Sequence, residues 1–278
     1  MTPPTPGCNP AVGGAKELRP FRPPRLSILA AYAVLSIYAG LILSTLWFLD
    51  LEPLQSVACS ERTWFAVRLS LGAATAAACL ALVCALPAAY ALSRHRFAGR
   101  SWVDAVLELP MVVSPAALGA MLLMFFSQPI GQWVQEHAVR FVFTVAGVVL
   151  AQFVTVLGVA VRLVKTAFDE VPTELETVAR TLGAGPRHVF WTVTLPLARR
   201  GVLAAFVVAW AKAVGEFGAT IMLAGTMALR TETLPIAIYL RLSTADLGGT
   251  AALILMLLCL GLGALAVTRQ LLGRATHA

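Results

Sequence analysis

Two ionisable residues lie inside one of the long apolar stretches of the sequence. Lys212 and Glu216 occur four positions apart in W-A-K-A-V-G-E-F-G-A-T, within the apolar span Gly201–Leu223. If that span is one continuous helix, the two side chains lie one turn apart on the same face. Each charge alone would cost about 2.5–3.5 kcal/mol at the centre of a bilayer. The pair indicates either a water-filled path that carries an ion or a structural ion pair between packed helices, and we favour the path.

A path through the membrane would use these residues in complementary ways. Lys212 would attract an anion, while Glu216 would hold the lysine in place and limit its affinity. This balance matters because binding must be strong enough for the ion to enter and weak enough for it to leave. Thr220, a further turn along the same predicted face, would supply a neutral hydrogen bond. The structural alternative makes the two charges a pair that ties neighbouring helices together.

A polar-edged segment, Thr173–Pro196, lies between two apolar spans. Thr173 and Glu176 have the spacing of a capping box, which predicts a helix that begins at Thr173. The apolar residues of this helix recur at helical spacing and share one face, namely Leu175, Val178, Ala179 and Leu182. The opposite face is polar, with Glu174, Glu176, Thr177, Arg180 and Thr181. An ordinary amphipathic helix that rests on the lipid headgroups is the alternative interpretation.

Glycine and proline divide this segment into two helical pieces. Gly183 ends the first helix, and Gly185 with Pro186 allows a sharp reversal of the chain. Arg187–Val193 then forms a second helical piece that leads to Leu195 and Pro196. We therefore predict a helix-turn-helix outside the membrane.

Other kinds of chemistry find little support in the sequence. No phosphate-binding loop of the form G-x-x-x-x-G-K-[ST] occurs, so the chain is not expected to bind ATP itself, and no Ser/His/Asp or metal-ligand constellation is visible. We therefore expect no enzyme activity, no metal and no cofactor in this chain. The cysteines have neither metal-ligand nor disulfide-framework spacing and are interpreted as packing residues: Cys8, Cys59, Cys79, Cys84 and Cys259.

The elements that must position these residues are membrane spans. The chain is 59% hydrophobic and 13% charged, whereas a soluble domain has about a quarter of its residues charged. An all-α integral membrane protein with six transmembrane helices is therefore predicted. The predicted spans are Leu26–Leu49, Trp64–Leu92, Leu109–Phe126, Phe141–Val164, Gly201–Leu223 and Gly249–Thr268. Prolines at 87, 110 and 115 should kink or open the second and third spans.

The remaining segments supply the topology. Residues 1–25 are rich in Pro and Gly and are predicted to form a disordered cytoplasmic tail, which leaves 26–278 as the membrane domain. Basic residues concentrate on one side of the six-span arrangement, and the opposite loops hold only Arg62, Arg140, Arg230 and Arg241. Both termini and the helix-turn-helix are therefore predicted to be cytoplasmic. The net charge of +7 then reflects topology, and no nucleic acid is expected as a partner.

Two stretches carry a resemblance to a known family. The first stretch resembles the cytoplasmic EAA coupling loop of ABC importer permeases. The residues that carry this resemblance are Gly183, Val193, Leu195 and Pro196, preceded by Ala179-Arg180. Thr177 and Val178 depart from the pattern, although Glu176 is adjacent. The second stretch looks like the molybdate branch of the molybdate/sulfate permeases. It consists of G-E-F-G-A-T at 215–220 with the preceding Lys212, followed by T-L-P…Y at 233–239. Two further stretches agree with the pattern of the molybdate branch, namely Leu109-Pro110 through Pro115 and Leu182-Gly183-Ala184. The resemblance runs from about Trp64 to the C-terminus.

The resemblance implies the membrane half of an importer in a bacterial inner membrane. Its expected partners are a second copy of the chain, two cytoplasmic ATPase subunits that bind ATP and Mg, and a periplasmic or extracellular oxyanion-binding protein. The coupling loop would be 166–200, and its contact residues would be Thr173, Leu175, Glu176, Val178, Ala179, Arg180, Leu182, Gly183, Val193, Leu195 and Pro196. Molybdate is the expected cargo, with tungstate, sulfate and thiosulfate as alternatives. An ion-coupled secondary transporter is a more remote alternative, because no clear internal repeat is visible.

Overall fold

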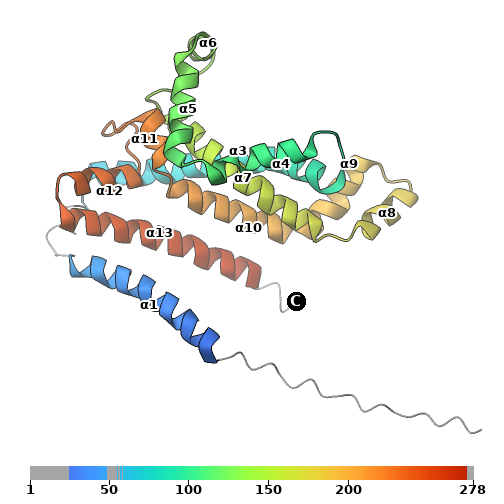
Figure 1. Cartoon of the computed structure of the whole chain (residues 1–278), viewed down its shortest axis with the longest axis horizontal. Helices are drawn as coiled ribbons and strands as arrows, with labels where there is room; N and C mark the ends of the chain where they lie inside the picture. Colours follow the sequence, from blue (N-terminus) through green and yellow to red (C-terminus); the bar gives the residue numbers. More distant parts are fainter. Residues whose placement is uncertain (1–24, 49–54, 56, 58, 274–278) are drawn as a thin grey trace, which may run out of the picture. The chain divides into compact units, whose positions relative to one another are not determined.

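The computed structural model describes residues 25–48, 55, 57 and 59–273, and every element in these residues is helical. The tail predicted at 1–25 lies outside them, except that Arg25 begins the first helix. The helices are α1 (Arg25–Trp47), α3 (Glu61–Arg94), α4 (Arg100–Val112), α5 (Pro115–Ser127), α6 (Pro129–His137), α7 (Val145–Asp169), α8 (Thr173–Thr181), α9 (Pro186–Val189), the π-helix η1 (Phe190–Thr194), α10 (Leu195–Val214), α11 (Gly218–Ala224), α12 (Leu234–Ser243) and α13 (Leu247–Gly273) (Figure 1).

Residues 1–44 and 45–278 form two separate units. In the first unit, α1 is apolar on all sides over Ile28–Trp47, with a mean hydropathy of 1.9. Such a helix has the length and composition of a membrane span. The second unit contains all the other helices.

Five helices of the described chain are long and apolar enough to cross a membrane, or six if one bent pair counts as a span. The five are α1, α3, α7, the run from α9 into α10 (Pro186–Val214), and α13. The bent pair is α4 and α5, which meet at 111°. The third predicted span, Leu109–Phe126, therefore runs from the end of α4 into α5 and is broken between them, in the region where Pro110 and Pro115 predicted a kink. The chain breaks at Ser114 because Pro115 disfavours helical geometry in the residue before it, and the Ser114 hydroxyl then accepts a hydrogen bond from the Ala117 amide.

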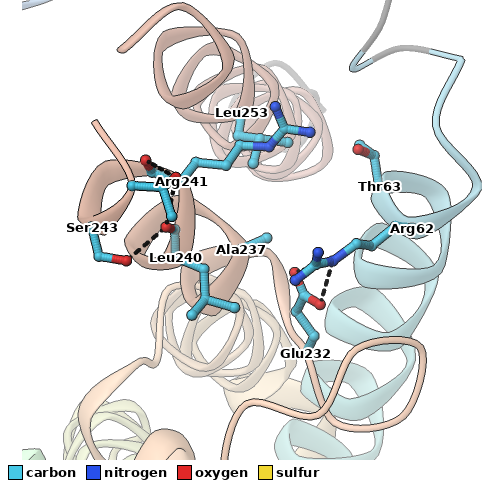
Figure 2. A pocket seen from close by; sticks show the side chains of 9 residues that line it. Arg62, Thr63, Glu232, Ala237, Leu240, Arg241, Ser243 and Leu253 are labelled. Atoms are coloured by element: carbon cyan, nitrogen blue, oxygen red, sulfur yellow. Dashed lines mark hydrogen bonds and ion pairs between the residues drawn. The ribbon is translucent and has the colours of Figure 1, made fainter. Parts of the chain in front are cut away.

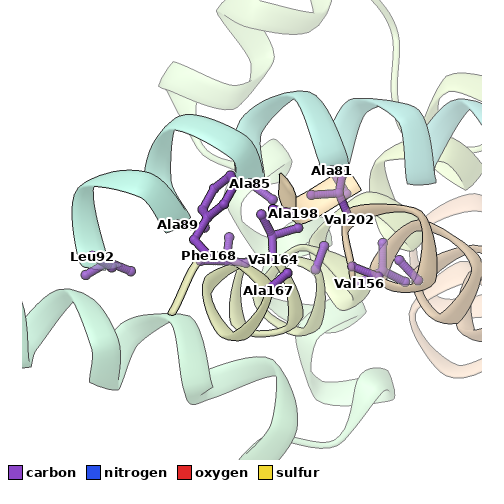
Figure 3. Close-up of a cluster of buried hydrophobic side chains, with 14 of the residues drawn as sticks. Ala81, Ala85, Ala89, Leu92, Val156, Val164, Ala167, Phe168, Ala198 and Val202 are labelled. Atoms are coloured by element: carbon purple, nitrogen blue, oxygen red, sulfur yellow. The ribbon is translucent and has the colours of Figure 1, made fainter. Parts of the chain in front are cut away.

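The core of the second unit is formed by α3, α7 and α10, packed through small residues. Alanines recur along one face of α3 at helical spacing, and Ala81, Ala85 and Ala89 contact Val164 and Phe168 of α7 within one buried cluster (Figure 3). Small residues let the backbones of membrane helices approach closely, which gives dispersion contacts that the lipid cannot replace. This core fixes the positions at which α3 and α7 end, and both ends meet the segment that begins with α8.

The four described cysteines, Cys59, Cys79, Cys84 and Cys259, are all exposed on the isolated chain. The prediction that cysteines act as packing residues is therefore wrong for these four. They lie on outward faces of their elements, where a small sulfhydryl is compatible with a lipid environment.

Candidate functional site

The segment that follows α7 forms a helix, a turn and a second helical piece, as predicted. α8 spans Thr173–Thr181, and Gly183 has a φ of +89°, which a residue with a side chain rarely adopts. The second piece does not stop at Val193. It continues from Pro186 through the π-helix η1 into α10, so Leu195 and Pro196 begin the long membrane helix itself.

The predicted capping box is wrong. Pro172 occupies the N-cap position of α8, and no side chain caps the helix there. Thr173 is instead the first helical residue, and its backbone carbonyl accepts a hydrogen bond from the Thr177 hydroxyl. Glu176 does not reach back to the helix start because it is turned into the protein, where stronger partners are available.

Glu176 is the centre of a buried polar network, although its side chain was predicted on the outer, polar face. Only 4% of the residue is exposed. Its Oε1 accepts hydrogen bonds from Arg94 Nε and Thr194 Oγ1, each at 2.9 Å. Arg180 approaches Oε2 at the longer distance of 3.9 Å. The buried carboxylate is thus satisfied by a cation from α3 and a hydroxyl from η1.

Arg94 connects this network to the end of α7. Its Nη2 donates to the carbonyl oxygens of Phe168 and Val171, both at 2.9 Å. A guanidinium group near a helix C-terminus satisfies carbonyls that have no partner within the helix and interacts favourably with the helix dipole. One arginine therefore ties the ends of α3 and α7 to α8. Sequence analysis missed Arg94, whose only signal was a basic residue at the end of a span.

The face of α8 that was predicted to gather apolar residues is directed away from the protein. Leu175, Val178 and Leu182 are 46%, 56% and 83% exposed. Burying Glu176 and exposing three aliphatic residues is the reverse of an ordinary amphipathic surface helix. Exposed apolar side chains on a firmly anchored helix mark this face as a candidate interaction surface.

The second candidate site is a break in the predicted fifth span. α10 ends at Val214, and α11 begins at Gly218. Lys212 and Glu216 therefore do not lie one turn apart on a continuous helix, and within the described residues no ion pair joins them. Glu216 is 4% exposed, and its Oε1 accepts a hydrogen bond from the Ala219 amide at 3.0 Å. Gly218 lies so close to α5 that a Cβ there would meet the Ala116 amide nitrogen at 2.9 Å, and the Glu216 carboxylate stabilises the first turn of α11.

Thr220 is fully buried on α11, and its hydroxyl has no hydrogen-bond partner within the described chain. The same is true of both polar atoms of Gln152 on α7. Val148 shares a buried cluster with Ala224, and Gln152 and Thr220 each lie one turn further along the same two helices. Gln152 and Thr220 therefore lie on two helices that pack against each other. Gln152 was missed by sequence analysis, where its only signal was an amide inside an apolar span.

A family model for the inner membrane component of binding-protein-dependent transport systems matches residues 77–276. The chain belongs to this family. It is therefore a multi-pass membrane permease, and the matched range contains both candidate sites.

Named relatives agree with this assignment. The molybdenum transport system permease protein ModB of Escherichia coli K12 is 35% identical over 219 residues, which cover 76% of this chain and 94% of the relative. ModB of Haemophilus influenzae is 36% identical over 180 residues, 63% of this chain and 77% of the relative. The sulfate transport system permease protein CysW of Synechocystis is 34% identical over 197 residues, with 69% and 71% covered.

Solved structures support the same fold for the permease. One similar structure is a bacterial alginate ABC transporter in complex with an alginate pentasaccharide-bound periplasmic protein. The match has a TM-score of 0.70 and 16% sequence identity, and it covers 91% of this chain and 96% of that chain. The methionine ABC transporter MetNI matches with a TM-score of 0.60 and 19% identity, over 77% and 98%. At these identities the likeness establishes the fold alone.

Proposed function

We propose that this permease moves molybdate into the cytoplasm as the membrane subunit of an ABC importer. The observation that carries the proposal is the 35% identity with a molybdenum permease over 94% of that relative's length. The stretches at 182–184, 215–220 and 233–239 lie within the family match and resemble the molybdate branch.

Uptake of radiolabelled molybdate tests this proposal. Cells that lack the chain should accumulate little molybdate from dilute medium, and a plasmid copy should restore uptake. Unlabelled tungstate, sulfate and thiosulfate, each added in excess, would rank the competing oxyanions. Sulfate is the second candidate because the similar Synechocystis protein is a sulfate permease. Loss of sulfate uptake with unchanged molybdate uptake would favour that candidate.

The proposed assembly contains two copies of this permease, two cytoplasmic ATPase subunits and a periplasmic oxyanion-binding protein. ATP and Mg would bind to the ATPase subunits. The family is defined by dependence on a binding protein, which supports that partner. A single copy also leaves several large apolar side chains of α5 and α6 exposed, including Met124, Ile130 and Trp133, and α5 and α6 project from the core (Figure 1). Co-purification with an ATPase and light scattering of the purified complex would test the stoichiometry.

The proposed orientation places both termini and α8 in the cytoplasm. The excess of Lys and Arg near the ends of α3 and α7 supports it, since cytoplasmic loops are enriched in basic residues. A green fluorescent protein fused after residue 278 should fluoresce, whereas an alkaline phosphatase fused at the same position should be inactive. The opposite pair of results would reverse the orientation.

In the proposed coupling step, the exposed face of α8 docks on an ATPase subunit. A rigid connection is required for motion at α8 to reach the spans. The Glu176–Arg94 pair, with the hydrogen bonds of Arg94 to the end of α7, supplies such a connection to α3 and α7. η1 carries the same motion into α10, because Thr194 hydrogen-bonds to Glu176.

In the proposed pathway, Lys212 of α10 is the intramembrane cation, and Thr220 of α11 and Gln152 of α7 are neutral polar groups on the helices that pack against each other. Lys212 is partly buried and makes no ion pair within the described residues, which leaves its charge available to an anion. Glu216 has a different role from the one predicted, since it caps α11 and keeps the break open. Lys212→Gln should lower uptake while Glu216→Gln, which retains an acceptor oxygen, should preserve it.

A further inference from the structure

A cavity of about 290 Å³ with a mixed polar and apolar lining lies between the start of α3 and α12, and none of the residues of the two candidate sites lines it. Arg62 and Thr63 line one wall, while Glu232 and Arg241 line others (Figure 2). The guanidinium groups of Arg62 and Arg241 extend toward the same space from α3 and α12. Each arginine has a carboxylate partner, Glu232 for Arg62 and Asp246 for Arg241, so the question is which guanidinium nitrogens remain free to donate.

Each guanidinium is only partly engaged by protein carboxylates. Arg62 uses Nε alone to donate to both oxygens of Glu232, at 2.7 and 3.0 Å, and its side chain is 51% exposed. Arg241 donates from Nη1 to Asp246 Oδ2 at 2.8 Å. The two Nη groups of Arg62 and the Nη2 of Arg241 make no hydrogen bond within the described chain. Several charge-assisted donors are therefore free at one cavity.

Thr63 adds a neutral donor. The residue is only 3% exposed, and it lines the cavity. The hydroxyls of Ser243 and Thr244, on the same cavity, already donate to backbone carbonyls such as that of Leu240. Thr63 thus adds a hydroxyl-bearing residue from α3 to the cavity wall, opposite the residues of α12.

We propose that this cavity binds a small tetrahedral oxyanion. Arg62, Arg241 and Thr63 would donate to its oxygens, and a tetrahedral oxyanion is small enough for the cavity. Glu232 and Asp246 balance the formal charges of the two arginines, so the anion is held reversibly, by the guanidinium nitrogens that the carboxylates leave free. That the anion is the transported cargo, and that the cavity is on the outer face, rests on the proposed function. Anion binding by the cavity does not.

Calorimetric titration of the purified full-length permease with molybdate and with sulfate tests the proposal. Dodecyl maltoside is a suitable detergent because it contains no phosphate. Saturable binding is expected, and Arg241→Gln or Thr63→Val should weaken the affinity, by roughly tenfold for the arginine variant. Arg62→Gln combined with Glu232→Gln should have a similar effect without leaving a buried carboxylate unpaired. Arg230→Gln, an exposed arginine outside this cavity, is the matched control and should not change the affinity.

Absence of binding, or equal affinity in Arg241→Gln, Thr63→Val and the parent, would overturn the proposal. A phospholipid phosphate has the same chemistry, so a second titration includes phosphatidylglycerol. Competition by this lipid, lost in the same variants, would assign the cavity to a lipid headgroup instead of a free oxyanion. Uptake assays separate this proposal from the function. If the parent takes up molybdate but the variants bind the anion as tightly as the parent does, anion binding at this cavity is refuted and the proposed function stands. If the variants weaken binding but the parent takes up no oxyanion, anion binding at the cavity is supported and the proposed function is refuted.

Discussion

The segment around α8 and the break between α10 and α11 differ in whether their buried polar groups have hydrogen-bond partners. At α8, Glu176 is buried, and Arg94 and Thr194 satisfy its carboxylate. At the break, Gln152 and Thr220 are buried on facing helices, and their polar atoms have no partner within the described chain. Hydrogen bonds hold the first region in one geometry. In the second region, the buried polar groups have no hydrogen bonds that would compensate for their lost contact with water.

This difference teaches which region can move. A protein is strongly destabilised when one partner of a buried charge pair is lost. We therefore expect α8 to remain attached to α3 and α7 throughout a transport cycle. Buried groups without partners gain stability when another conformation, water or a passing anion satisfies them. The break is therefore the region expected to change its contacts. The following predictions test this contrast and run from the largest to the smallest expected effect on stability.

Glu176→Ala should destabilise the permease by about 3–5 kcal/mol, because it leaves the buried guanidinium of Arg94 without its carboxylate. Thermal unfolding in detergent measures the change. Glu174→Ala removes an exposed carboxylate from the same helix and is the control. Equal unfolding temperatures for the two variants would show that the network does not anchor α8.

Thr220→Val and Thr194→Val should shift stability in opposite directions. Both threonines are fully buried, but only the Thr194 hydroxyl is hydrogen-bonded. Replacing an unsatisfied hydroxyl with a methyl group should stabilise the protein by about 1–3 kcal/mol, while removal of the Thr194 donor should destabilise it to a similar extent. Denaturation of both variants in parallel compares the two regions directly. Destabilisation by Thr220→Val would mean that its hydroxyl is satisfied in the resting protein.

Gly183→Ala should cost about 1–2 kcal/mol, because alanine is strained in the left-handed conformation at φ +89°. Gly185→Ala is a matched control, since Gly185 has a φ of −68° and a Cβ there would meet no atom within 4 Å. Unfolding temperature and molybdate uptake should both fall for the first variant only. A similar loss in both would point to flexibility of the turn rather than to its backbone angle.

Leu182→Asp should change stability by no more than about 0.5 kcal/mol, because the side chain is 83% exposed. It should nevertheless abolish coupled uptake if α8 docks on an ATPase subunit. Uptake, ATP hydrolysis and ATPase co-purification are the measurements, with Thr181→Asp as the charge-matched control. Normal uptake by Leu182→Asp at equal expression would remove this face from the coupling step.

The sequence by itself determined the class and much of the order of the elements. Long apolar runs predicted helices close to α1, α3, α7 and α13, because a span needs about twenty apolar residues whatever its neighbours are. Gly183 predicted the turn after α8, since its conformational requirement is local. Pro115 likewise indicated an interruption of the third span, although not a bend of 111°. The resemblance carried by 179–196 and 215–220 also pointed to the family that the match over 77–276 established.

Only the tertiary structure decided what the polar residues do. The sequence predicts a local capping role for Glu176, but in the structure its carboxylate pairs with Arg94, which lies 82 positions away in the chain, in a buried site. Lys212 and Glu216 have the spacing of a helical pair, yet the chain breaks between them, and Glu216 caps α11. Spacing predicts which side chains share a face only while the helix continues. The partner that a buried charge finally takes depends on which helices pack together, because burial makes an unsatisfied charge costlier than a broken local pattern.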